Sequence, residues 1–75
     1  MEFKKTRINF NKNFYFLEAI EQAIKDYCEV CSGKVDVLEN NFLVELTPKT
    51  DVDSKFLSGE FSNYVLSILK NKGLV

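Results

Sequence analysis

Cys28 and Cys31 form a C-x-x-C pair, and their type and spacing invite a chemical role more directly than any other residues of this chain. Two thiolates can supply half of a structural zinc site, but such a site needs four ligands. The sequence contains no histidine and no second cysteine pair. Two copies of the chain could together supply four sulfur ligands, so a metal shared between two protomers is one hypothesis for this pair.

A redox role for the same two cysteines would need a lowered thiol pKa. Redox pairs of this kind lie at a helix N-terminus, where the helix dipole favours the thiolate. The spacing of apolar residues predicts a helix from Tyr15 to Cys31, which would place both cysteines on the apolar side of its last turn. The dipole there opposes ionisation. We therefore interpret the pair first as core residues, with the shared metal and the redox role as alternatives.

The carboxylates offer weaker candidates for chemistry. Asp36 and Glu45 are expected to face each other across a hairpin, but no neighbouring pattern predicts the desolvating pocket that an acid–base pair needs. Asp51 and Asp53 resemble the opening of a calcium loop whose glycine and final glutamate are out of place. The sequence also lacks a glycine-rich phosphate loop, a nucleophile motif and a histidine base. These observations predict a protein that is not an enzyme and takes no cofactor.

The composition restricts the class of protein further. A length of 75 residues predicts one small domain spanning residues 1–75, and 45% hydrophobic with 28% charged residues is typical of a globular chain. A net charge of -1 without a basic stripe argues against nucleic-acid binding. The apolar runs are too short to cross a membrane, and no secretory signal is recognisable. We therefore expect a cytoplasmic protein with reduced cysteines.

The elements that position these residues can be predicted from hydrophobic periodicity. Alternating apolar and polar residues predict a first strand from Glu2 to Phe10. The helix from Tyr15 to Cys31 follows, with Asn13 expected to cap its start and Gly33 expected to close its end.

A β-hairpin is the clearest local prediction, and it covers Lys34 to Thr47. Two β-rich runs flank Asn40-Asn41, and asparagine tolerates positive φ well enough to form a two-residue turn. Counting outward from this turn places Val37 opposite Val44.

The same count places Asp36 opposite Glu45, and like charges in that position are unfavourable. We therefore expect basic residues beside Glu45, and Lys5 and Arg7 of the first strand are the candidates. This favours pairing of the first strand with the third, which makes the third strand central.

Helical spacing returns near the end of the chain and predicts a helix over about Ser58 to Lys72. Either Asp53 or Ser58 could cap its start, and the sequence does not choose between them. Gly73 suits the residue that closes a helix.

These elements predict an α+β fold of the order β-α-β-β-α. We expect a three-stranded antiparallel-type sheet in the order 2-3-1, with both helices on one face. In outline this is a ferredoxin-like sandwich that stops before its last strand.

Three stretches of the chain resemble HxsD, a family of small accessory proteins of His-Xaa-Ser peptide-modification systems, encoded beside radical-SAM maturases. The stretches are Tyr15-x-x-x-Ala19-Ile20-x-x-Ala23-x-x-x-Tyr27, then Phe42-Leu43-Val44-x-Leu46 running into Pro48, and Glu60-Phe61-x-Asn63-Tyr64-x-Leu66. The resemblance spans the chain from the first strand to the last helix, and the cysteines lie outside it. It implies a non-catalytic adaptor that binds a radical-SAM maturase or its precursor peptide, and it supplies no catalytic residues.

The expected sheet has an open edge along Lys34 to Glu39, and lightly guarded edges tend to be covered or used. A partner protein or peptide is therefore expected to contact a set of five residues: Lys34, Asp36, Leu38, Glu60 and Asn63. The alternative function is a self-associating structural or regulatory domain, a homodimer that a metal could bridge through Cys28 and Cys31.

Overall fold

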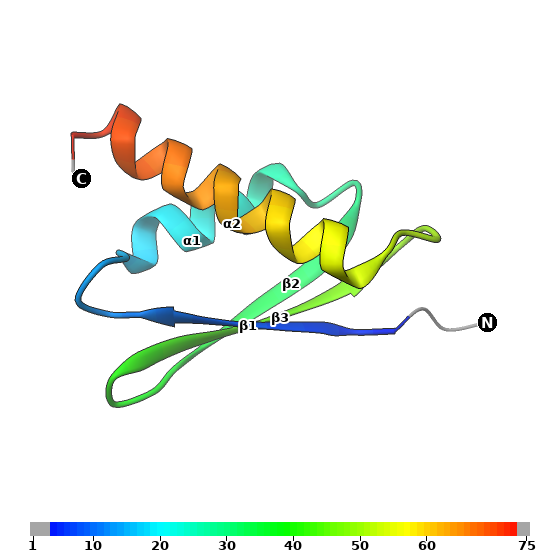
Figure 1. Ribbon diagram of the computed structural model, residues 1–75, viewed down its shortest axis with the longest axis horizontal. Coiled ribbons are helices and arrows are strands. Elements are labelled where there is room, and N and C mark those ends of the chain that lie inside the picture. Colours follow the sequence, from blue (N-terminus) through cyan, green and yellow to red (C-terminus); the bar gives the residue numbers. More distant parts are fainter. Residues whose placement is uncertain (1–3, 74–75) are drawn as a thin grey trace.

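The structure is a computed structural model that describes residues 4–73, and it contains a three-stranded sheet with two helices on one face (Figure 1). In chain order the elements are β1 (Thr6–Asn11), α1 (Leu17–Asp26), β2 (Cys31–Val37), β3 (Asn41–Pro48) and α2 (Ser54–Asn71). The predicted β-α-β-β-α order is confirmed. The first residues of the predicted first strand, 2 and 3, lie outside the described residues.

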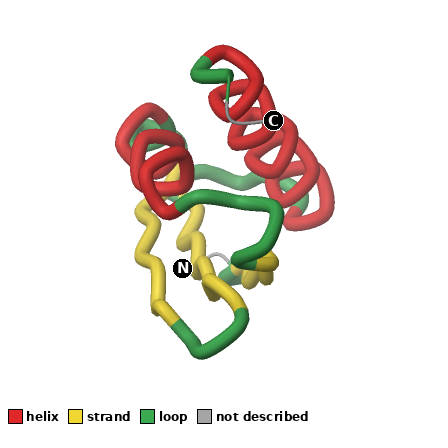
Figure 2. The backbone as a smooth tube through the Cα atoms, turned by 90° about the vertical axis from the view of Figure 1, so that its left-hand side faces the viewer, coloured by secondary structure: helices red, strands yellow, loops and turns green. Residues whose placement is uncertain are grey.

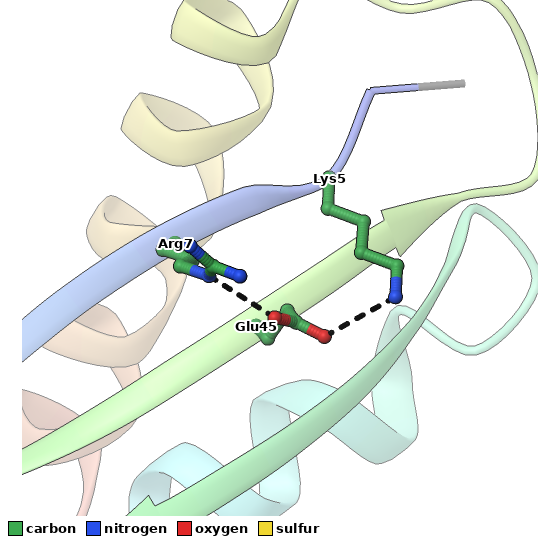
Figure 3. A network of polar contacts seen from close by, with 3 residues as sticks. All are labelled: Lys5, Arg7 and Glu45. Carbon is green, nitrogen blue, oxygen red and sulfur yellow. Dashed lines mark hydrogen bonds and ion pairs between the residues drawn. The ribbon is translucent and has the colours of Figure 1, made fainter. Parts of the chain in front are cut away.

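The strands are ordered β1-β3-β2, and β3 pairs antiparallel with both neighbours. Arg7 pairs with Glu45 across β1 and β3, and its Nε lies 3.1 Å from the Glu45 carboxylate. Lys5 Nζ lies 3.6 Å from the same group (Figure 3). The predicted sheet order and the basic residues expected beside Glu45 are therefore both confirmed.

The register of the hairpin differs from the predicted one by two residues. Val37 pairs with Phe42, and the Leu38 amide donates to the Asn41 carbonyl at 2.8 Å, so the turn lies over Glu39 and Asn40. The two-residue turn expected at Asn40-Asn41 is wrong. In the described residues only a glycine has positive φ, so the asparagines do not adopt the conformation that the expected turn requires.

This register also changes the charge pairs. Lys34 pairs with Glu45, and Asp36 pairs with Leu43, so the expected pairing of Asp36 with Glu45 is wrong. A shift of two residues leaves each side chain on its predicted face, because side chains alternate with a period of two. The third strand is central as predicted, although the pairing of Asp36 with Glu45 that was used to predict it does not occur.

Helix α1 is shorter than the predicted helix at both ends. It begins after Phe16, which makes no side-chain capping bond, whereas Asn13 lies in the turn that follows β1. It ends at Asp26, and Cys31 begins β2. Cys31 is apolar and buried, so its spacing fits both a helix stripe and the inner side of a strand. Gly33 lies within β2 and does not close the helix.

Helix α2 begins at Ser54 because Asp53 caps it, with its carboxylate accepting a hydrogen bond from the Lys55 amide at 2.9 Å. Of the two starts considered, Asp53 is therefore the correct one, and the range beginning at Ser58 starts too late. Gly73 has a φ of 72° and donates its amide to the Lys70 carbonyl, as expected for a closing glycine.

The core lies between the sheet and the helices. Helix α1 packs over β2 and helix α2 packs over β1. Figures 1 and 2 show from two directions that both helices lie on the same side of the sheet. The largest fully buried side chains come from all five elements and include Phe10, Ile20, Cys31, Leu46 and Phe61. Burial of this apolar surface is the main stabilising term of the fold. None of the helices in the described residues is both long and apolar enough to span a membrane.

Candidate functional site

Strand β2 lies at the edge of the sheet, and its free backbone groups can be assigned from its bonds to β3. The Leu38 amide donates to Asn41, and the Lys49 amide donates to the Val30 carbonyl. In an antiparallel pair only alternate residues bond to the neighbouring strand. The even-numbered residues of β2 therefore bond to β3. The backbone groups of Gly33, Val35 and Val37 point outward and are free to pair with another strand.

Three of the residues predicted to bind a partner lie together on this edge. Lys34 and Asp36 are exposed and point to the sheet face that carries no helix. Leu38 follows them in the same alternation and is 44% exposed. They form an exposed row along the open face, and Val37, at 57% exposure, lies on the other side of the same strand. We call this stretch, residues 33–38, the β2 edge.

A groove runs beside the β2 edge on its helix side. It has a volume of about 250 Å³ and lies between two sets of residues: Glu21, Ile24 and Lys25 of α1, and Gly33, Lys34 and Val35 of β2. A Cβ atom on Gly33 would lie 3.1 Å from the Ile24 side chain and 3.0 Å from the Leu46 side chain, so glycine suits this close approach of the helix to the strand. Ile24 and Val35 supply its apolar walls, and the charged residues of α1 form its rim. The sequence pattern did not reveal this groove.

The open face of the sheet carries a charge cluster around Glu45. The hydrogen bond from Arg7 holds the pKa of Glu45 below its usual range, and the charges of Lys5 and Lys34 act in the same direction. Lys5, Lys34 and Glu45 also line a second open depression, of about 220 Å³, at this end of the sheet. Because the carboxylate partly neutralises its basic neighbours, the cluster does not have the single sign of charge expected of an anion site.

The other two predicted contact residues, Glu60 and Asn63, are exposed on α2. Phe56 lies one helical turn before Glu60 and is 64% exposed. Because α2 packs on β1 and α1 packs on β2, α1 lies between α2 and the β2 edge (Figure 2). The structure therefore does not join the five predicted residues into one surface.

Five aromatic rings, those of Phe10, Tyr15, Tyr27, Phe61 and Tyr64, pack together at the core. Tyr15 packs edge-on against Phe10, with ring centroids 4.8 Å apart, and Phe10 lies 6.3 Å from Phe61. Tyr27 then packs against Phe61 at 5.5 Å and against Tyr64 at 5.2 Å. Packing of this chain of rings accounts for these aromatic positions without a ligand.

The two cysteines do not share a surface. Cys28 is exposed in the turn after α1, whereas Cys31 is 1% exposed at the start of β2. The prediction that both lie on a helix stripe is therefore wrong. Burial raises the pKa of the Cys31 thiol, and the nearby charge of Lys49 only partly opposes this effect. Within residues 4–73 no three side chains suited to metal binding lie together.

The β2 edge and its groove therefore remain the best candidate for a site, because they combine free backbone groups with an apolar hollow. Comparison with known proteins adds no assignment, since no family model, curated protein or solved structure matches the chain.

Proposed function

We propose that this protein is a non-catalytic adaptor that binds an extended peptide segment of a partner protein along the β2 edge. The observation that carries the proposal is the row of outward backbone groups on Gly33, Val35 and Val37, lying directly beside the groove under α1. Backbone pairing supplies affinity in this mode of recognition, and pockets for alternate side chains supply specificity.

The geometry of strand addition indicates how such a peptide would be read. The peptide residue opposite Val35 would direct its side chain to the helix face and into the groove beside Ile24. The residues before and after it would lie on the open face, opposite Lys34 and Asp36. A peptide with an aliphatic residue between an acidic and a basic residue fits this arrangement.

The resemblance to HxsD supports a particular class of partner. It favours the precursor peptide of a His-Xaa-Ser modification system, or the radical-SAM maturase that acts on it, as the source of the bound segment. Glu60 and Asn63 lie beyond α1, so they would contact a different part of the partner from the segment on the β2 edge. A folded partner such as an enzyme could reach both places.

The alternative function, a homodimer bridged by metal through both cysteines, has less support. A bridging metal would need both thiols at the surface, whereas Cys31 is covered by the core. Self-association by other means does not depend on the cysteines.

The test is a titration of isotope-labelled protein with the products of neighbouring genes, followed by amide chemical shifts. We expect the shifts to concentrate on residues 33–38 and on Ile24. Val37→Pro should abolish binding, because the lost amide points outward and the bonds between β2 and β3 remain. Asp36→Lys should weaken binding, because it sets a positive charge opposite the basic residue of the peptide. Asp51→Lys, which makes the same change in the exposed loop before α2, is its control. Shifts confined to α2, with residues 33–38 silent, would exclude the edge mechanism.

A further inference from the structure

The β2 edge has a sequence that is complementary to itself. Lys34 and Asp36 lie at equal distances on either side of Val35, and the backbone groups of Val35 point outward. If a second copy pairs antiparallel about a two-fold axis at Val35, each Lys34 lies opposite Asp36 of the other copy. Opposite charges in directly opposed positions stabilise a strand pair.

We propose that a second copy of this chain occupies this edge in the free protein. The two Val35 residues then form a hydrogen-bonded pair that shares both backbone bonds. The product is one continuous six-stranded antiparallel sheet in the order β1-β3-β2-β2-β3-β1, with the contact the same on both copies.

The shape of the edge supports the same register as its charges. Two-fold pairing about Val35 sets Val37 of one copy opposite Gly33 of the other. Val37 is 57% exposed, and its side chain points to the helix face. Gly33 has no side chain and lines the groove formed with Ile24. An exposed aliphatic side chain therefore meets an apolar hollow of the second copy, twice in the dimer.

This inference goes beyond the proposed function and does not rest on it, although both concern the same edge. A peptide that binds the β2 edge would have to displace the second copy. Dimerisation is measured without any peptide, so the absence of a dimer would not contradict peptide binding. The absence of peptide binding would likewise not contradict the dimer.

The test exchanges the two charges and measures the oligomeric state by sedimentation. Lys34→Asp alone sets two pairs of carboxylates opposite each other, and Asp36→Lys alone sets two pairs of amines opposite each other. Each variant should weaken dimerisation roughly tenfold or more. An equimolar mixture of the two variants should form a heterodimer, because every opposed pair then has opposite charges. The double variant Lys34→Asp/Asp36→Lys should dimerise like the native chain.

The native chain provides a second measurement that needs no variant. The Val35 amide faces away from β3, so it should exchange with solvent rapidly in dilute protein and more slowly as the concentration rises. A native chain that stays monomeric with a rapidly exchanging Val35 amide would overturn the inference. So would a dimer that both single variants leave intact, because its interface would then lie elsewhere.

Discussion

The hydroxyl of Tyr64 donates a 2.6 Å hydrogen bond to Oδ2 of Asp26, and this bond ties the middle of α2 to the last residue of α1. Oδ1 of the same carboxylate accepts a second hydrogen bond, from Gln22 at 2.9 Å. Helix α1 has only 10 residues, and isolated helices of that length are marginal in water. Contacts to α2 and to the sheet must therefore hold it in place.

We expect Tyr64→Phe to lower the stability of the protein at neutral pH and to lose its effect in alkali. The hydrogen bond to Asp26 and the negative charge of that residue raise the pKa of Tyr64 above its usual value of 10.0. The folded state therefore holds this proton more tightly than the unfolded state. The stabilisation is fully present below the unfolded pKa and is lost as the pH rises through the folded pKa. Denaturant unfolding across the alkaline range tests this, with Tyr15→Phe as control. Equal pH profiles for both variants would contradict the assignment.

The carboxylate of Glu45 gives a prediction on the acid side. Arg7 holds its pKa below the usual 4.5, so the folded state stabilises the ionised form. That contribution is present above pH 4.5 and is lost as the pH falls through the lowered folded pKa. Arg7→Met should raise the pKa of Glu45 in a carboxyl NMR titration, whereas Lys4→Met should leave it nearly unchanged. An unchanged Glu45 titration in Arg7→Met would show that the ion pair does not persist in solution.

Gly33 and Gly59 should respond to alanine in opposite directions. A Cβ on Gly33 would lie 3.0 Å from the Leu46 side chain and 3.1 Å from the Ile24 side chain, so both side chains must give by a few tenths of an ångström. We expect Gly33→Ala to cost about 1–3 kcal/mol of unfolding free energy. Gly59 lies inside α2 with nothing within 4 Å of an added Cβ, so Gly59→Ala should gain about 0.5–1 kcal/mol. Urea unfolding measures both. A neutral Gly33→Ala would mean that the approach of α1 is not tight.

The sheet order could be predicted because it depends on charge and on alternation. Arg7 and Glu45 face each other in the structure. Opposite charges favour facing positions, and this preference can be predicted from the sequence. The position of the hairpin turn could not be predicted from the sequence. A turn over Asn40-Asn41 would have bonded Val35 and Val37 to β3, whereas the observed turn leaves both pointing outward.

The candidate site was likewise only partly predictable from the sequence. An open edge on β2 follows from the strand order, so Lys34, Asp36 and Leu38 could be proposed from the sequence. The groove beside them depends on how closely Ile24 approaches Gly33, and nothing in the local pattern states that distance. The boundary between α1 and β2 was missed because a buried Cys31 satisfies either periodicity.

Thr6 should tolerate the loss of its hydroxyl. Thr6 is 7% exposed, and its Oγ1 is buried without a hydrogen-bond partner among the described residues. Valine has almost the same shape and leaves no polar atom unsatisfied, so we expect Thr6→Val to raise the unfolding free energy by about 1 kcal/mol. Thr50→Val, at an exposed position, should stay within about 0.5 kcal/mol of the native chain. A destabilised Thr6→Val would reveal that the hydroxyl has a partner in solution.

The two cysteines should behave as different kinds of residue. Cys31 is covered by the core, so Cys31→Ser buries an unpaired hydroxyl and should cost about 1–3 kcal/mol. Cys28 is exposed, so Cys28→Ser should change the stability by no more than about 0.5 kcal/mol.

A thiol reagent should modify Cys28 rapidly in the folded protein. It should reach Cys31 only through unfolding, because burial also raises the pKa of that thiol and disfavours the reactive thiolate. Chelators should leave the melting temperature unchanged. Equal labelling rates for the two thiols, or a melting temperature that falls on chelation, would show that Cys31 is accessible and would restore the metal-bridged dimer as a candidate.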